Sequence, residues 1–267
     1  MKLSPKRPLL MGILNSTPDS FFDKGAYFSL DKGIKRGLQL IEDGADILDI
    51  GGASSRPGAP IVEVEEEIRR VIPFIEALAP TTSIPISIDT GRFEVAKLAI
   101  EKGAKFINDI TGFKDPKMRE LAAQCDADLC VMHAQGPPQT MQINPSYPDG
   151  VVETILRFFE TQIELLTQAG VKESRIILDP GIGFGKTLDH NLAIFKAIDQ
   201  FKRFGLRVLI GASRKGFMTK ILGKPAAELL APTLAVHAFS FLKGADIIRV
   251  HDVREHRDAL TVAAHFL

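Results

Sequence analysis

Four basic side chains stand at or just beyond the ends of short apolar segments, where a fold could bring them together. They are Arg56, Lys215, Arg249 and His251. Arg249 and His251 alternate around one valine, so in a strand both side chains point to the same side. An arginine guanidinium matches phosphate oxygens with a planar fork of donors, and several cations gathered in one place favour a polyanionic group. These residues therefore indicate the binding of a diphosphate.

Three further polar residues at segment ends suit a different part of a ligand. Asp89, Asn108 and Asp179 are not suited to bind phosphate. Their side-chain oxygens accept hydrogen bonds and so match a ring rich in N–H donors, such as an aminopyrimidinone. Asp179 opens the segment Asp179–Thr187, in which three glycines at alternate positions let the backbone approach a ligand closely. This segment fits neither the P-loop nor the dinucleotide fingerprint, because in each case one required glycine is replaced. The two groups together predict one site for a basic heterocycle linked to pyrophosphate.

The elements that must position these residues are eight short apolar segments, nearly all followed directly by a polar residue. They are Leu9–Leu14 before Asn15, Ala45–Leu48 before Asp49, Ile84–Ile88 before Asp89, Ala104–Ile107 before Asn108 and Asp109, Leu129–Met132 before His133, Ile176–Leu178 before Asp179, Val208–Ala212 before Ser213, and Ile247–Ile248 before Arg249. Continuous apolar segments of this kind are typical of strands buried on both faces. Eight such strands alternating with helices predict an α/β fold, a single (β/α)8 TIM barrel, whose catalytic groups lie at the C-terminal strand ends.

Helical patterns separate most of these segments. The predicted helices are Lys32–Glu42, Val62–Leu78, Arg92–Glu101, Pro116–Gln124, Gly150–Gln168, Asn191–Phe204, Ala227–Leu242 and Val253–Phe266. Pro73 inside the second of them is expected to kink or split it. The proline-rich segment Ala134–Tyr147 is expected to be a long functional loop at the exit of the fifth strand. We see no domain boundary within residues 1–267.

Length and composition fit one barrel of the usual ~250 residues. The chain has 267 residues, with 33 basic and 33 acidic side chains, so the global charge predicts neither a nucleic-acid nor a membrane partner. Every apolar segment ends well short of the ~18 residues of a membrane span, and Met1–Pro8 is too polar for a signal peptide. Cys125 and Cys130 are expected to be reduced thiols, which suits the cytoplasm. No histidine or cysteine cluster has zinc-ligand spacing.

At this point the chain resembles the bacterial dihydropteroate synthase family of pterin-binding barrels. The matching segments are Asn15–Phe21, Asp49–Gly58, Ser87–Thr90, Asn108–Ile110, Met132–His133, Asp179–Lys186, Ser213–Lys215 and Arg249–Val253. They extend from the first strand to the last in the order of the family. The first two, with Thr-Pro-Asp-Ser and Ser-Arg-Pro-Gly, are the most specific.

The resemblance implies an activity and its ligands. The reaction would condense 6-hydroxymethyl-7,8-dihydropterin pyrophosphate with 4-aminobenzoate to give 7,8-dihydropteroate and pyrophosphate, with Mg²⁺ as cofactor. Sulfonamides would inhibit it, and the protein would be a cytoplasmic homodimer.

The resemblance also assigns roles to residues. Those implied for the pterin are Asp89, Asn108, Met132, Asp179 and Lys215; for the pyrophosphate, Ser55, Arg56, Arg249 and His251; for 4-aminobenzoate, Phe21, Pro57, Phe184 and Gly216; and for Mg²⁺, Asn15. The implied catalytic residues are Asp89, Asp179, Lys215 and Arg249. In a dissociative displacement the carboxylates would stabilise the positive charge that develops on the pterin methylene, while neutralised pyrophosphate departs.

The sequence departs from the family pattern at three places. Ala53 replaces a usual glutamate, and Gly216 replaces a serine that contacts the aminobenzoate carboxylate, a contact that a backbone N–H could provide instead. Phe22 and Lys24 replace small loop residues, which bears on loop motion and on sulfonamide sensitivity.

Two other functions stay open from the sequence. A methyltetrahydrofolate–corrinoid methyltransferase would keep Asp89, Asn108 and Asp179 but would not need Asn15 or Arg56. A catalytically silent pterin-binding paralogue should have lost the first loop or one of the cations, and all of these are present.

Overall fold

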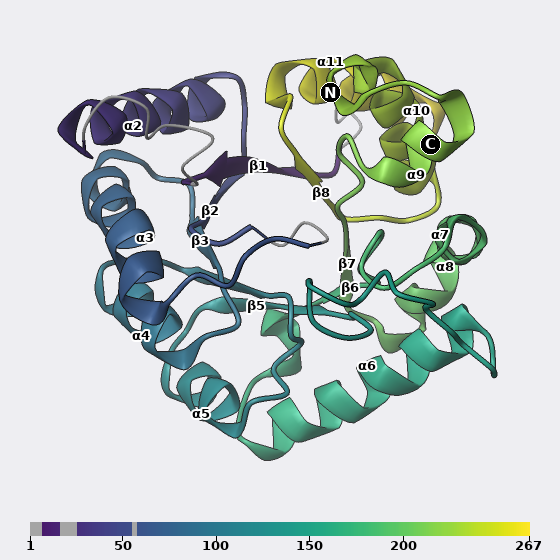
Figure 1. Ribbon diagram of the computed structural model, residues 1–267, viewed down its shortest axis with the longest axis horizontal. Coiled ribbons are helices and arrows are strands. Elements are labelled where there is room, and N and C mark those ends of the chain that lie inside the picture. Colours follow the sequence, from purple (N-terminus) through teal and green to yellow (C-terminus); the bar gives the residue numbers. More distant parts are fainter. Residues whose placement is uncertain (1–6, 17–25, 55–57) are drawn as a thin grey trace, which may run out of the picture.

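A closed barrel of eight parallel strands forms the centre of the protein (Figure 1). The computed structural model describes residues 7–16, 26–54 and 58–267. The strands follow the order of the sequence around the barrel: β1 (Leu9–Asn15), β2 (Ile47–Gly51), β3 (Ile86–Asp89), β4 (Phe106–Asp109), β5 (Asp128–Met132), β6 (Ile176–Asp179), β7 (Arg207–Ile210) and β8 (Ile247–Val250). The predicted (β/α)8 barrel is confirmed.

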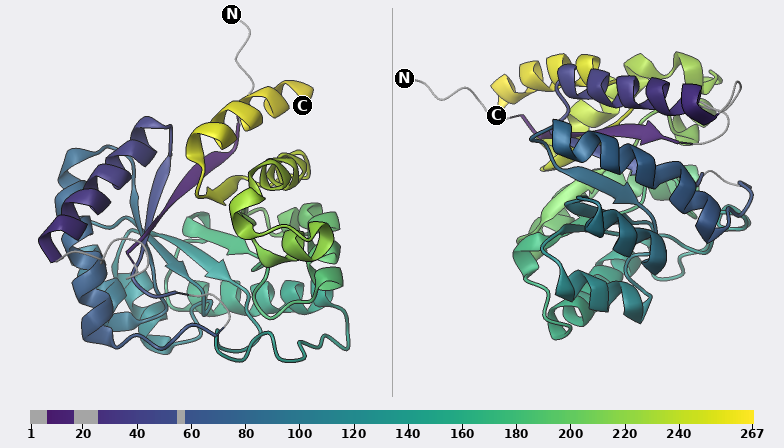
Figure 2. Two further views of the ribbon diagram at one scale, coloured as in Figure 1. Left: turned by 45° about the horizontal axis from the view of Figure 1, so that its top comes forward. Right: turned by 90° about the vertical axis from the view of Figure 1, so that its left-hand side faces the viewer.

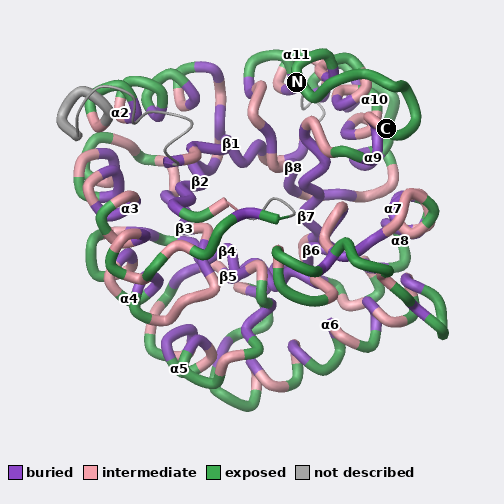
Figure 3. The backbone as a smooth tube through the Cα atoms, viewed as in Figure 1, coloured by how far each residue is buried: buried purple, intermediate pink, exposed green. Residues whose placement is uncertain are grey.

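Helices surround the strands on the outside, as both views in Figure 2 show. They are α2 (Ala26–Glu42), α3 (Val64–Leu78), α4 (Phe93–Glu101), α5 (Pro116–Gln124), α6 (Val151–Gln168), α7 (Leu188–Lys196), α8 (Ile198–Phe201), α9 (Gly216–Leu222), α10 (Leu230–Leu242) and α11 (Val253–Ala263). The strands are mostly buried, whereas the helices alternate between buried and exposed residues (Figure 3). None of the helices in the described part of the chain has the length and apolar character that a membrane span requires.

Several predicted element bounds are wrong in detail. The helix predicted over Asn191–Phe204 is divided at Ala197, whose backbone leaves the helical region so that the next turn can bury Ile198 and Phe201. The predicted helix ranges do not include the short helix α9, which begins at Gly216. Pro73 does not split α3, which runs on because apolar residues on both sides of it are buried.

The interior of the barrel explains where the polar strand ends lie. Residues that face inward alternate with residues that face the helices. The inward residues of seven strands form an apolar cluster of Met11, Ile47, Phe106, Cys130, Ile177, Leu209 and Ile247. Two positions further along the same strands, and so on the same side, follow Ile13, Asp49, Asn108, Met132, Asp179, Gly211 and Arg249. On four of these strands, the next inward position after the apolar interior is therefore a polar or charged residue of the barrel mouth: Asp49, Asn108, Asp179 and Arg249.

Phe106 is the largest side chain of this interior cluster and is 1% exposed. Replacing it in Phe106→Ala should lower the free energy of unfolding by about 3–5 kcal/mol, because a cavity remains under the polar mouth. Denaturant unfolding measures this, with Ile61→Ala as the control at a side chain that is 70% exposed. Equal losses in the two variants would contradict the interior cluster as the support of the barrel.

Candidate active site

A cavity of about 920 Å³ opens at the C-terminal ends of the strands. The predicted site residues that line it are Asn15, Asp89, Phe184, Lys215, Gly216, Arg249 and His251. The predicted pterin residues Asn108, Met132 and Asp179 do not line this cavity and are buried beside it. In the strand register Asn108 is the neighbour of Asp89, and Met132 is the neighbour of Asp179. The fold therefore brings the described members of both predicted groups to one mouth of the barrel.

Arg249 bridges two carboxylates inside this mouth. Its Nε donates to Asp49 Oδ2 at 2.6 Å, and its Nη2 donates to Asp89 Oδ2 at 2.6 Å. The sequence reasoning placed Arg249 with the phosphate cations and Asp89 with the ring acceptors. The structure pairs them, so the two halves of the predicted site meet at one guanidinium.

Asp49 is the residue that the site prediction missed. It is fully buried and, besides Arg249, accepts hydrogen bonds from Ser87 Oγ at 2.6 Å and from Asn108 Nδ2 at 3.2 Å. It was named as the residue after an apolar segment and as the first residue of the matching segment Asp49–Gly58, but was given no role. The available signal was its position two residues after Ile47, because this spacing puts it on the inward side of β2.

Burial shifts the acid–base properties of the site. It raises the pKa of Asp89 to about 7, which the attraction of Arg249 opposes and the neighbouring Asp49 reinforces. Burial also raises the pKa of Asp179, against the attraction of Lys215. The same effect lowers the pKa of Lys215 to about 8, with Asp179 opposing the change. The mouth thus contains carboxyl and ammonium groups that titrate closer to neutrality than they do in water, a feature typical of active sites.

The glycine segment after β6 is held by Lys186 and by close backbone packing. Lys186 is 2% exposed, and its Nζ contacts His133 Nδ1 at 3.1 Å and donates to the carbonyls of His133 and Phe184 at 3.2 and 3.0 Å. Gly181 has a φ of 68°, and a Cβ there would lie 1.9 Å from the His133 carbonyl oxygen. The segment therefore fits against the exit of β5 only with glycine at this position.

This packing presents Phe184 and Lys215 to the cavity. The Nζ of Lys215 donates to the Ile182 carbonyl and lies 4.5 Å from the centroid of the Phe184 ring. The glycine segment thus fixes the ammonium group of Lys215 beside an aromatic face.

The loop after β5, predicted over Ala134–Tyr147, is attached to its neighbours. Tyr147 Oη donates to the Gly185 carbonyl at 2.8 Å, and Gln142 Nε2 donates to the Gly183 carbonyl. On the other side, the amide of Gly58 donates to the Pro138 carbonyl at 3.2 Å. This loop therefore connects the exits of β2 and β6 across the barrel mouth.

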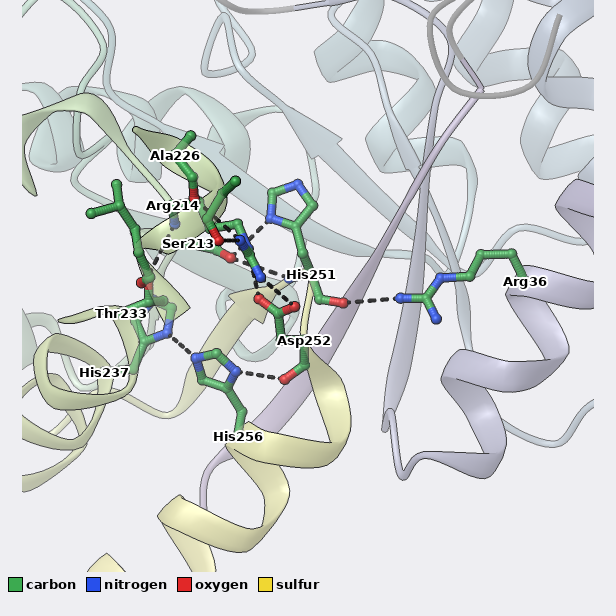
Figure 4. A network of polar contacts seen from close by, with 11 residues as sticks. Arg36, Ser213, Arg214, Ala226, Thr233, His237, His251, Asp252 and His256 are labelled. Atoms are coloured by element: carbon green, nitrogen blue, oxygen red, sulfur yellow. Dashed lines mark hydrogen bonds and ion pairs between the residues drawn. The ribbon is translucent and has the colours of Figure 1, made fainter. Parts of the chain in front are cut away.

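The exits of β7 and β8 are joined by polar contacts (Figure 4). Ser213 Oγ lies 2.9 Å from His251 Nδ1, and Arg214 makes a two-point ion pair with Asp252, with both N–O distances 2.9 Å. Arg36 of α2 donates to the His251 carbonyl at 3.2 Å. His251 is therefore held at the cavity wall from both sides.

Some predicted residues lie outside the described part of the chain. They are Phe21 and Pro57, predicted to flank 4-aminobenzoate, Ser55 and Arg56, predicted to bind pyrophosphate, and the loop residues Phe22 and Lys24. Gly216, at the start of α9, is described and exposed, and a Cβ there would meet no atom within 4 Å.

Asn15 meets the requirements for a weak Mg²⁺ ligand. It ends β1, lines the cavity, and makes no side-chain hydrogen bond within the described residues. Its amide oxygen is a hard donor of the kind that Mg²⁺ accepts. Among those residues no group of three or more acidic, histidine or cysteine side chains is placed to hold a metal. The donor set therefore fits an ion held mainly by substrate phosphates.

Comparison with known proteins gives one consistent result. A family profile described as "Pterin binding enzyme" matches residues 11–251. The chain is 44% identical to dihydropteroate synthase of Escherichia coli strain K12 over 260 residues, which covers 97% of this chain and 92% of that protein.

Solved structures agree with this result. Yersinia pestis dihydropteroate synthase in a complex with a sulfonamide drug superposes with a TM-score of 0.92 at 39% identity, covering 100% of this chain and 96% of that one. Xanthomonas albilineans dihydropteroate synthase with 4-aminobenzoic acid superposes with a TM-score of 0.91 at 38% identity, covering 99% and 94%. With a barrel mouth that combines acidic and basic groups in one cavity, the chain belongs to the dihydropteroate synthase family of pterin-binding enzymes.

Proposed function

We propose that this protein condenses 6-hydroxymethyl-7,8-dihydropterin pyrophosphate with 4-aminobenzoate, releasing 7,8-dihydropteroate and pyrophosphate. The main observation behind the proposal is that Arg249 donates hydrogen bonds to both Asp49 and Asp89. It does so at a cavity that Lys215 and His251 also line. A ligand that is a donor-rich ring at one end and a diphosphate at the other matches this arrangement. Family membership supports the same reaction.

The pterin ring would bind at the acidic end of the site. Asp89, Asn108 and Asp179 supply acceptors on three neighbouring or nearby strands, and Met132 lies beside Asp179 in the register. Lys215 contributes a cation beside them, because its Nζ lies over Phe184 next to the glycine segment. These groups would fix the ring so that its methylene carbon faces the second substrate.

The diphosphate would bind at the basic end. Arg249 uses Nε and Nη2 for carboxylates, and its Nη1 donates to no other described residue. His251 faces the same cavity, and Ser55 and Arg56 would complete the set. Asn15 would hold Mg²⁺ on the diphosphate, where the ion supplies charge neutralisation of the leaving group.

The chemical step is then a substitution at the pterin methylene. The C–O bond breaks, pyrophosphate departs with the electron pair, and positive charge develops on the methylene carbon. The carboxylates of Asp89 and Asp179 stabilise this charge in a site sheltered from water. The aniline nitrogen of 4-aminobenzoate forms the new C–N bond and loses a proton, so the protein forms no covalent intermediate.

The second substrate would lie against Phe184 and Gly216, and the resemblance adds Phe21 and Pro57 as further residues that flank its ring. Sulfonamides, which share the aromatic amine, would compete for the same position. The Yersinia pestis relative was solved with a sulfonamide drug and the Xanthomonas albilineans relative with 4-aminobenzoic acid, which supports the binding of both kinds of ligand.

Asp89→Asn tests the reaction and the role of this carboxylate together. Wild-type protein with pterin pyrophosphate, Mg²⁺ and 4-aminobenzoate should release pyrophosphate, and the variant should be about 100-fold slower or worse, because the developing cation loses a stabilising charge. A coupled pyrophosphate assay measures both. Binding of pterin pyrophosphate without 4-aminobenzoate-dependent release in the wild type would favour a silent paralogue instead.

Gly216→Ser tests the position of the aminobenzoate carboxylate. The backbone at Gly216 does not have a positive φ and a Cβ there has open space, so serine fits without strain. Its hydroxyl should donate to the carboxylate and lower the KM for 4-aminobenzoate several-fold, as one hydrogen bond to a charged group contributes about 1.5–3 kcal/mol at most. Steady-state kinetics with each substrate varied measure this. An unchanged KM would place the carboxylate elsewhere.

We also propose that the protein is a homodimer that pairs through its last helices. Exposed apolar side chains gather on α10, α11 and the C-terminal turn: Phe239, Leu242, Val262, Phe266 and Leu267. Light scattering should give twice the mass of the chain, and Val262→Asp should shift the equilibrium towards the monomer because it places a charge in the apolar contact. A wild-type mass equal to one chain would contradict the proposal.

A further inference from the structure

Two buried histidines form a pair that the proposed reaction does not use (Figure 4). His237 of α10 and His256 of α11 are both 0% exposed. His237 Nδ1 lies 2.8 Å from His256 Nε2, and the ring planes are inclined at 56°. Neither residue lines the cavity. Any effect of the pair on the cavity must therefore pass through the groups that it contacts.

The outer ends of the pair contact backbone atoms of two strand-end loops. On one side, the Ala212 amide donates to His237 Nε2 at 3.1 Å. On the other, His256 Nδ1 lies 2.6 Å from the Asp252 carbonyl oxygen. Ala212 precedes Ser213 and Lys215, and Asp252 follows His251. A continuous series of hydrogen bonds thus joins the two loops that carry these cavity residues.

The backbone contacts determine where the protons lie. An amide can only donate, so His237 Nε2 carries no proton, and a carbonyl can only accept, so His256 Nδ1 carries one. Between the rings, His237 Nδ1–H then donates to His256 Nε2. Both imidazoles are neutral and both have the proton on Nδ1. Burial lowers the pKa of both residues, which agrees with this assignment.

The loop after β7, residues Ala212–Lys215, contains an unfavourable backbone conformation that contacts with neighbouring residues must stabilise. Arg214 has a φ of 55°, a left-handed conformation that is unfavourable for a residue with a Cβ. Its amide donates to Thr233 Oγ1 of α10 at 3.1 Å, and its guanidinium pairs with Asp252. The ion pair is about a quarter exposed, whereas the histidine pair is fully buried and so keeps its strength in water and salt.

We propose that His237 and His256 are positioning residues that hold the loop Ala212–Lys215 in register with the turn at His251 and Asp252. They thereby place the Lys215 ammonium group and the His251 side chain for a diphosphate-bearing substrate. This inference rests on the proposed function. An apolar side chain at position 237 would leave the buried Ala212 amide without an acceptor and would release the loop.

Two substitutions of His237 test the proposal. His237→Leu fills the same buried space with an apolar side chain, which cannot accept the hydrogen bond from the Ala212 amide. His237→Gln offers an amide oxygen to Ala212 and an amide N–H towards His256, so it should restore the connection. Leu260→Ala is the matched control, because Leu260 is fully buried in α11 and contacts neither loop through a hydrogen bond.

The expected effect of the substitution differs between the two substrates. In His237→Leu, kcat/KM for pterin pyrophosphate should fall about tenfold, while the KM for 4-aminobenzoate changes less than twofold. Calorimetry should show a similar loss of affinity for inorganic pyrophosphate. His237→Gln should recover most of both losses. Leu260→Ala should lower the melting temperature and leave both values unchanged.

Other results would overturn the positioning role. They are unchanged pyrophosphate affinity in His237→Leu, equal effects on both substrates, or no recovery in His237→Gln. If His237→Leu fails to fold, ¹⁵N spectra of histidine-labelled wild type decide instead: both rings should be neutral with the proton on Nδ1 from pH 5 to 8, and a proton on His237 Nε2 would contradict the hydrogen-bond series. Wild type that binds pyrophosphate without turnover would contradict the proposed reaction alone.

Discussion

The bridge from Arg249 to Asp49 and Asp89 is the interaction on which the rest of the site depends. It joins β8 to β2 and β3 inside the barrel mouth, between positions 160 and 200 residues apart in the sequence. Buried charges are stable only when they are paired, and removal of one partner from such a group typically costs about 3–5 kcal/mol. The three side chains are therefore coupled, and any ligand must replace or extend contacts that the protein already makes with itself.

The strands make this bridge possible by a simple alternation. Inward apolar residues fill the barrel interior, and the next inward position on each strand belongs to the mouth. Asp49 and Arg249 follow Ile47 and Ile247 in this way. The apolar layer beneath them keeps water out from below, which is why burial dominates the pKa shifts of Asp89, Asp179 and Lys215.

Much of this arrangement could be predicted from the sequence, and the parts that could not have a physical reason. The apolar segments identified all eight strands, because a strand covered on both faces consists mostly of apolar residues. The partners of Arg249 were not predictable, since strand order alone does not say which carboxylate a long side chain reaches. Asp49 lies in a matching motif but belongs to no recognised phosphate or metal pattern. The break at Ala197 and the His237–His256 pair depend on packing between helices, which spacing along one helix does not show.

Gly181, in the glycine segment after β6, and Gly216, at the start of α9, have unequal freedom to change. A side chain at Gly181 would collide with the His133 carbonyl, so this position can change only if the exit of β5 moves as well. Gly216 has open space and an ordinary backbone conformation, so a mutation there costs the fold little. Selection for resistance can therefore act at Gly216 by a single substitution, whereas Gly181 stays fixed unless its neighbour moves. Inhibitors whose contacts depend on the backbone of the glycine segment would meet a part of the site with fewer routes to resistance.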